Sequence, residues 1–236
     1  MFEHSADLYD AIYDAAGKDY LTETTTVLDR LRAARGSDPR TLLDVACGTG
    51  RHLQYFSAVA RCVGLDVDPE LLAIATRRCP QVRFVRGDMT DFHLDETFDA
   101  VTCLFSSIGY VRTKPRLRRA VTAMASQLGP GGVLMVEPWL QPDGFRDGVV
   151  NLVNASRADD KVVRMMRSRR EGDLSVLEAH YLVGRPTGIA HFTERHELGL
   201  FSFEDYVNAF EAAGLRTQTE DTGLTGRGLI IGCRSD

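Results

Sequence analysis

The chain has 236 residues, and 44% of them are hydrophobic, which is enough to bury one substantial core in a single domain or in a domain with a large insertion. A net charge of −5 disfavours a protein that binds nucleic acid by neutralising phosphates. No apolar run approaches the roughly 20 residues that span a bilayer, and the acidic N-terminal segment lacks a signal-peptide core, so the sequence predicts a cytoplasmic protein without a membrane partner.

The first predicted element is helical, over residues 5–35, with an interruption at Gly17. From residue 41 onward, strands and helices alternate. Predicted strands cover residues 41–45, 62–67, 82–88, 98–105 and 132–138, and predicted helices cover residues 51–60, 69–78 and 115–128. This repeated alternation indicates an α/β fold with a mostly parallel sheet and helices on both faces.

The pattern changes between residues 139 and 198, where arginine-rich and alternating stretches are separated by Gly and Pro. It predicts antiparallel strands inserted into the α/β domain. A helix over residues 202–214 and a final strand over 227–234 return to the earlier pattern. The sequence therefore predicts an α/β domain made of residues 1–138 and 199–236, with residues 139–198 as an inserted antiparallel subdomain.

Cysteine and histidine spacing disfavours a metal site. The five cysteines contain no C-x-x-C pair, which suggests reduced thiols rather than disulfides or zinc ligands. His191 and His196 are the closest of the six histidines, and at a spacing of five they would not share a helix face. We therefore expect no metal cofactor.

The segment TLLDVACGTG at residues 41–50 has the pattern of a buried strand that leads into a glycine turn and then a helix. Gly48 and Gly50 permit a tight turn whose backbone lies close to a ligand. The dinucleotide fingerprint G-x-G-x-x-G is incomplete, because Leu53 occupies the third glycine position. This difference favours S-adenosylmethionine over NAD as the ligand.

Acidic and apolar residues follow the other strands, at the edge of an open α/β sheet where ligands bind. Asp66 is placed to accept both hydroxyls of a ribose, and Asp88 to accept the adenine amino group. Each feature alone also fits a helix cap, a turn or a core residue, whereas their joint order favours a cofactor site. The predicted cofactor-binding residues are Tyr20, Asp44, Ala46, Cys47, Gly48, Gly50, Asp66, Val67, Asp88, Met89 and Phe105.

The chain contains four motifs, namely LLDVACGTG, GLDVDPELL, VRGDMTDF and GPGGVLMVEPW. In these four motifs the chain resembles a class I S-adenosylmethionine-dependent methyltransferase. The likeness narrows with YDAIYDAAGKDY at 9–20, LFSSIGYV at 104–111, EPW at 137–139 and GLTGRGLIIG at 223–232. In these segments the chain resembles the dTDP-3-amino-sugar N,N-dimethyltransferases of desosamine and mycaminose biosynthesis, from its first helix to its last strand.

The resemblance implies a Rossmann-like, seven-stranded, mostly parallel sheet whose last strand is antiparallel, and an antiparallel insertion that forms part of the acceptor site. It implies S-adenosylmethionine as cofactor, two successive methylations of the amine of a dTDP-linked amino sugar, and often a homodimer. By residue matching, Tyr13 and Trp139 fall where the family approaches its sugar nucleotide. Arg164 and Arg227 match arginines near the phosphates or the nucleoside.

Arg167 is a further candidate for substrate binding. On an alternating strand Arg167 and Arg169 share a face, from which they can grip a diphosphate. The alternative is a solvated strand face that protects a sheet edge from pairing with another chain.

The need for a general base stays open. An amine with a pKa near 8 is about a tenth neutral at pH 7, so a base would help without being required. The candidates are Tyr13, Tyr20, His52, Tyr110 and Glu137, and the sequence singles out none of them. Packing explains His52 better than catalysis does, whereas Glu137 fits an acid that orients the ammonium as well as it fits a turn cap. Two other functions also stay open, namely methylation of another small amine or hydroxyl, and cofactor binding without turnover.

Overall fold

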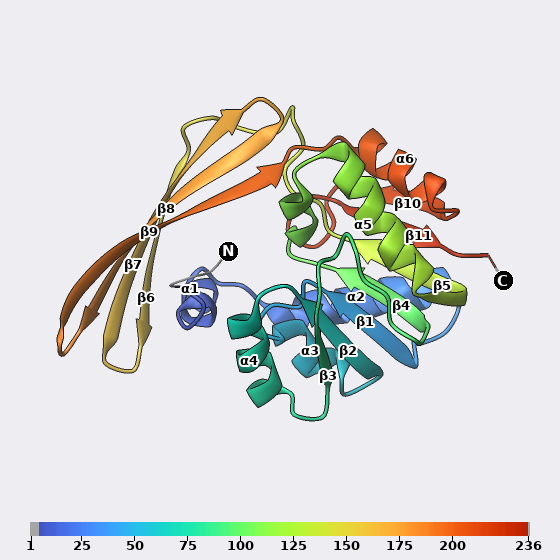
Figure 1. Ribbon diagram of the computed structural model, residues 1–236, viewed down its shortest axis with the longest axis horizontal. Helices are drawn as coiled ribbons and strands as arrows, with labels where there is room; N and C mark the ends of the chain where they lie inside the picture. The colour runs from blue at the N-terminus through green and yellow to red at the C-terminus, as the bar shows by residue number, and fades with distance from the viewer. Residues whose placement is uncertain (1–4, 236) are drawn as a thin grey trace.

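The structure is a computed structural model that describes residues 5–235, and it contains a seven-stranded sheet and a separate four-stranded sheet (Figure 1). The larger sheet has the strand order β10-β11-β5-β4-β1-β2-β3. Its strands are β1 (Thr41–Val45), β2 (Arg61–Asp66), β3 (Arg83–Arg86), β4 (Phe98–Cys103), β5 (Leu128–Val136), β10 (Arg216–Glu220) and β11 (Leu229–Cys233). Neighbouring strands are parallel except that β11 is antiparallel to both β5 and β10, which confirms the predicted fold.

Helices cover both faces of this sheet because its central strands are apolar on both sides. Leu43 and Val45 of β1 pack in one core cluster with residues of α5 (Lys114–Ser126) and α6 (Phe203–Ala212). Leu42, one position earlier on the same strand, packs with residues of α2 (Tyr20–Arg35), α3 (Arg51–Phe56) and α4 (Pro69–Arg78). The alternation along β1 therefore sets a helix layer on each side, as expected for a parallel sheet.

The four-stranded sheet is an antiparallel meander that projects from the α/β body (Figure 1). It consists of β6 (Val150–Arg157), β7 (Asp160–Glu171), β8 (Leu174–Arg185) and β9 (Gly188–Gly199). Helix α1 (Tyr9–Ala15) lies between it and the α/β body, and Leu8 and Ile12 share a core cluster with Val162 and Tyr181 of this sheet. The antiparallel insertion is thus confirmed, while its role as a separate substrate-binding subdomain of residues 139–198 stays a prediction.

Several boundaries differ from the sequence-based expectation. The helix expected over residues 5–35 is two helices, because residues 16–19 leave the helical path and Asp19 caps α2 by accepting a hydrogen bond from the Thr22 N–H at 3.0 Å. Strand β10 was missed, since its sequence RTQTE lacks apolar alternation and it lies at the sheet edge. No helix within residues 5–235 is long and apolar enough to cross a bilayer.

Candidate active site

A cavity of about 1020 Å³ opens at the carboxyl ends of the central strands of the larger sheet. Its floor includes the turn after β1 and the residues that follow β2, β3 and β4. Its other walls are α1, the loop from α1 to α2, the inner face of the four-stranded sheet and the loop before β11. One cavity therefore joins the predicted cofactor end to the insertion.

The turn after β1 depends on left-handed backbone conformations. Ala46, Gly48 and Gly50 have φ values of 58°, 54° and 75°. A Cβ atom on Gly50 would lie 3.1 Å from the Cβ of Ala75 in α4, so a side chain would be crowded there, whereas Gly48 has open space at this position. Gly48 lines the cavity, so a ligand can approach its backbone without meeting a side chain.

Asp66 is the last residue of β2, and the turn is built around its carboxylate. One of its oxygens accepts the Gly48 N–H at 2.8 Å, and the other accepts the Asp68 N–H at 2.9 Å. Burial raises the pKa of Asp66, and these backbone hydrogen bonds oppose the shift. Each carboxylate oxygen keeps a further lone pair, so a residue that lines the cavity can still accept hydroxyl groups from a ligand.

Asp88 and Met89 line the cavity after β3. Asp88 accepts hydrogen bonds from the Thr90 N–H at 2.8 Å and from the Thr90 hydroxyl at 2.9 Å, and Arg116 lies 3.2 Å away. Although partial burial favours the protonated acid, these contacts lower the pKa of Asp88. Asp88 therefore presents an ionised carboxylate at the cavity edge, where a ligand amino group can donate to it.

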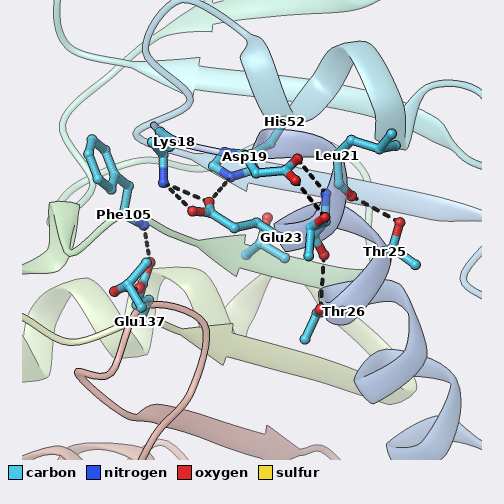
Figure 2. A network of polar contacts seen from close by, with 12 residues as sticks. Lys18, Asp19, Leu21, Glu23, Thr25, Thr26, His52, Phe105 and Glu137 are labelled. Carbon is cyan, nitrogen blue, oxygen red and sulfur yellow. Dashed lines mark hydrogen bonds and ion pairs between the residues drawn. The ribbon is translucent and has the colours of Figure 1, made fainter. Parts of the chain in front are cut away.

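Phe105 follows β4 and forms a wall of the cavity together with Lys18 (Figure 2). Its φ is 53°, and the buried carboxyl group of Glu137 holds this conformation by accepting the Phe105 N–H at 2.6 Å. The ammonium of Lys18 lies 3.7 Å from the centre of the Phe105 ring. The Tyr13 ring packs edge-on against the same ring, with centroids 4.8 Å apart.

Lys18 also connects the cavity to His52 through Glu23 (Figure 2). The Lys18 ammonium donates to both oxygens of Glu23, at 2.6 and 2.7 Å, and Nε2 of His52 lies 2.9 Å from the same carboxylate. Burial lowers the pKa of Lys18, and the hydrogen bonds that Lys18 donates to Glu23 oppose this shift. Burial favours the protonated form of Glu23, yet the hydrogen bonds from His52 and Lys18 hold its pKa below the usual value.

Four predicted cofactor residues lie behind the cavity wall. Asp44 is 2% exposed and accepts a hydrogen bond from the Thr102 hydroxyl at 2.7 Å, and burial raises its pKa to about 6. Cys47 and Gly50 shape the turn, because the Gly50 N–H donates to the Cys47 carbonyl at 3.0 Å. Tyr20 is buried beneath Lys18, whose ammonium lies 4.9 Å from the centre of the Tyr20 ring. The structure therefore gives these residues supporting positions.

Two predicted catalytic candidates are also set back from the cavity. His52 is 7% exposed and reaches the cavity only through Glu23. Glu137 is fully buried, and it accepts hydrogen bonds from the Phe105 N–H and, at 2.5 Å, from the Thr225 hydroxyl. Glu137 thereby fastens two loops of the site, which is a positioning role.

Aromatic and basic side chains gather at the end of the cavity that lies next to the four-stranded sheet. Nη1 of Arg227 donates to Oγ of Ser106 at 2.9 Å, and the guanidinium lies 4.5 Å from the centre of the Trp139 ring. The Arg164 guanidinium lies 5.2 Å from the centre of the Tyr13 ring. Within residues 5–235, Nε of Arg164 and Nε1 of Trp139 are buried without a hydrogen-bond partner. These donors are consistent with a polar ligand in the cavity.

Arg167 does not join this group. Side chains alternate along β7, so the face that carries Arg164 and Met166 toward the cavity excludes Arg167. Arg167 is exposed and pairs in register with Glu178 of β8. Arg169 shares this outer face, where it forms ion pairs with Glu171 and Glu178. Arg167 and Arg169 therefore lie on the face of β7 that points away from the cavity.

Comparison with known proteins places the chain in a family. Residues 42–132 match the family described as a methyltransferase domain. The chain is 42% identical to the dTDP-3-amino-3,4,6-trideoxy-alpha-D-glucopyranose N,N-dimethyltransferase of Streptomyces venezuelae over 96% of each chain. It is also 42% identical to the dTDP-4-amino-2,3,4,6-tetradeoxy-D-glucose N,N-dimethyltransferase of Saccharopolyspora spinosa, over 98% of this chain and 92% of that one. The chain belongs to the dTDP-amino-sugar N,N-dimethyltransferase family.

Solved structures agree with this assignment. The crystal structure of Streptomyces venezuelae DesVI matches the methyltransferase with a TM-score of 0.93 at 40% identity, over 98% of each chain. An amino pentose methyltransferase from Micromonospora echinaspora, solved with bound S-adenosylmethionine and involved in calicheamicin biosynthesis, matches with a TM-score of 0.88 at 43% identity, over 97% of each chain. The resemblance seen in the sequence is confirmed.

The structure adds cavity residues of the methyltransferase that sequence reasoning did not select. Lys18, Tyr181 and His196 line the cavity beside the predicted residues. Lys18 belongs to the GKDY segment that carried the resemblance, so a signal for it was present. Tyr181 and His196 lie on alternating strands whose inner face the sequence alone does not identify.

Proposed function

We propose that this methyltransferase transfers methyl groups from S-adenosylmethionine to the amine of a dTDP-linked amino-deoxy sugar, in two successive steps. One observation carries the proposal: a single cavity joins the glycine turn and Asp66 to the aromatic and basic cluster of Trp139, Arg164 and Arg227. The relatives that are 42% identical to the chain are named as N,N-dimethyltransferases of such sugars.

The residues at the cofactor end fit S-adenosylmethionine. Gly48 leaves open space beside the turn, and Asp66 has unused acceptor capacity for the ribose hydroxyls. Asp88 can accept the adenine amino group, and Met89 and Phe105 offer polarizable and aromatic surface. Ala46 and Val67 complete this part of the lining. When bound, the cofactor supplies an electrophilic methyl group on a sulfonium.

The chain itself contributes chiefly by orientation. Arg164 and Arg227 can hold the phosphates of the nucleotide, and Trp139 can stack against its base. Tyr13 stands between Phe105 and Arg164, so it borders both ends of the cavity. Holding the amine in line with the methyl group can supply roughly 7 to 11 kcal/mol in favourable systems. The transfer needs no covalent enzyme intermediate.

The position of the amine is left to experiment, because relatives of equal identity are named for a 3-amino and for a 4-amino sugar. The test offers a dTDP-3-amino-3,6-dideoxyhexose and a dTDP-4-amino-4,6-dideoxyhexose and measures S-adenosylhomocysteine and the mass of the product. We expect release of S-adenosylhomocysteine with one of the two sugars, and a product whose mass has increased by two methyl groups. Release only with another small amine or hydroxyl would support the alternative methyltransferase, and cofactor binding without release would support a non-catalytic protein.

We further propose a homodimer, formed through the outer face of the four-stranded sheet. Large apolar side chains are exposed there, with Val150 at 57%, Met165 at 47%, Leu182 at 48% and Ile189 at 80%. A second copy would cover this face by placing the same face against it. Sedimentation analysis should give the mass of two chains, and Met165→Glu should shift it toward one. A wild-type monomer at micromolar concentration would refute the proposal.

The proposed location is the cytoplasm, where both nucleotide sugar and cofactor would be available. The five cysteines are free, and four of them are buried. Such thiols are typical of a reducing compartment. Fractionation of the producing cells, with immunodetection of the enzyme, tests the location.

A further inference from the structure

Tyr110, His196 and Glu194 form a chain of polar groups at the acceptor end of the cavity. Tyr110 belongs to the 3-10 helix η1 (Ser107–Val111), which follows β4, whereas His196 and Glu194 lie on the inner face of β9. The Tyr110 hydroxyl lies 3.2 Å from Nδ1 of His196. Nε2 of His196 lies 3.5 Å from Oε2 of Glu194, which also accepts a hydrogen bond from the Ser5 hydroxyl at 2.7 Å.

Burial gives this chain of groups its chemical character. His196 is 6% exposed and Glu194 is 8% exposed, so water screens their interaction weakly. Burial raises the pKa of Tyr110 well above its ordinary value, and the nearby Tyr13, Tyr181, Glu194 and Asp66 raise it further. Tyr110 therefore keeps its proton at neutral pH. It can receive a proton only if it passes its own proton to a neighbour at the same time.

His196 is placed to be that neighbour. A neutral imidazole with its proton on Nε2 offers Nδ1 as an acceptor to the Tyr110 hydroxyl. The Glu194 carboxylate lies on the Nε2 side, where it favours this tautomer and stabilises the imidazolium that forms when Nδ1 gains a proton. The three groups thus have the order of a donor, a base and an orienting acid.

We propose that Tyr110, His196 and Glu194 form the path by which the acceptor amine loses its proton before each methyl transfer; this inference rests on the proposed function. The N–H bond of the ammonium breaks and an O–H bond forms at Tyr110, while the original Tyr110 proton moves to Nδ1 of His196. The freed lone pair then forms the N–C bond, and the C–S electron pair stays on sulfur. The proton leaves His196 for solvent once the products have gone.

Dimethylation makes such a path useful. The product of the first transfer is a secondary ammonium, which cannot attack again until it loses a proton. An amine with a pKa near 8 is mostly protonated at pH 7, so both the primary and the secondary ammonium must lose a proton at the site. The path through Tyr110 to His196 gives that proton a route away from the amine.

Other ionisable groups face this relay and belong in the interpretation of any pH profile. They lie on α1, β2, β7 and β8. They are Tyr9, Tyr13, Asp66, Arg164 and Tyr181. Each of them stays in place in the variants described next, so a change in the profile reports on the substituted group.

The test compares wild type with Tyr110→Phe over about pH 6 to 9.5, at saturating cofactor, with the dTDP-amino sugar that the enzyme methylates. The rate deficit of Tyr110→Phe should be about tenfold at pH 7, where most of the amine is protonated, and should vanish by about pH 9, where the amine is already neutral. His196→Gln should show the same trend. The double variant should lose no more than either single variant, because both interrupt one path.

Tyr55→Phe on α3 is the matched control, since Tyr55 lies outside the cavity lining, and its profile should follow that of wild type. Calorimetric S-adenosylmethionine binding and thermal unfolding check that each variant folds. A deficit of equal size at every pH, or losses that multiply in the double variant, would overturn the relay. Absence of turnover by wild type with every dTDP-amino sugar would instead overturn the proposed function.

Discussion

Asp10 offers a direct test of how α1 is held over the cavity. The Thr49 hydroxyl, in the glycine turn, donates to Oδ1 of Asp10 at 2.7 Å, and the Arg78 guanidinium from α4 donates to Oδ2. Arg78 also donates to the Thr49 carbonyl. A second contact joins Arg51 to Asp14 at the other end of α1. The glycine turn after β1, α4 and α1 are thus held together.

Asp10→Asn keeps the shape of the side chain and removes its charge. One amide oxygen can still accept from Thr49, but the amide NH₂ then faces the Arg78 guanidinium, so one charge-assisted hydrogen bond is lost. Such bonds contribute about 1.5 to 3 kcal/mol, and the lower end applies because the two side chains are 19% and 23% exposed. We expect α1 to detach about tenfold more often.

Hydrogen exchange of the α1 backbone amides measures this directly. Binding affinity is a less sensitive readout, because a tenfold increase in a rare open state leaves the closed state dominant. The control is Asp29→Asn on α2, which removes a carboxylate from an ion pair whose side chains are 55% and 62% exposed. Unchanged protection of α1 in Asp10→Asn, or the same loss of protection in Asp29→Asn, would refute the reasoning.

Three further substitutions test the site. Burial raises the pKa of Asp44 from 3.8 to about 6, so the contribution of Asp44 to stability is present at low pH and is lost as pH rises through 6. Relative to wild type, Asp44→Asn should therefore gain about 3 kcal/mol in free energy of unfolding between about pH 3.5 and pH 7. A difference between the two proteins that stays constant with pH would contradict this. Arg164→Ala should weaken binding of dTDP at least about tenfold by calorimetry, whereas Arg167→Ala on the outer face should leave it unchanged. Glu137→Ala removes the acceptor of both the Phe105 N–H and the Thr225 hydroxyl and should lower the free energy of unfolding by about 2 to 4 kcal/mol in denaturant titrations, and a loss below about 0.5 kcal/mol would argue against the loop-fastening role.

The larger sheet and its glycine turn were predictable because their signals are local. Buried parallel strands are near-continuous apolar runs, and a left-handed turn calls for glycine at Gly48. The same local signals could not separate Asp44 from Asp66, although both lie at strand ends. Asp66 closes β2 and faces the turn, whereas Asp44 lies inside the sheet, where β4 places Thr102 against it. Strand pairing decides which acid reaches the cavity.

In the insertion, too, the sequence alone does not show which side chains reach the cavity. Its antiparallel character follows from alternation, but a shift of one residue exchanges the two faces of a strand. Arg164 lines the cavity and Arg167 does not, because Arg164 is paired with Tyr181 on the inner face and Arg167 with Glu178 on the outer one. Nothing within the arginine-rich segment itself indicates which of its two sets of alternating side chains faces the cavity.

Substrate choice within the family is expected to depend on this same surface. Two relatives with equal identity to the chain are named for amines at different ring positions, so overall likeness does not determine where the amine lies. The proposed cofactor end is formed by the turn and by Asp66, and the proposed acceptor end is lined by residues such as Tyr181 and His196 from separate strands of the insertion. A sugar turned by one ring position would present its amine to a different part of that inner face. Discrimination between the two amines is therefore expected to depend on the register of β8 and β9, which forms only when the sheet folds.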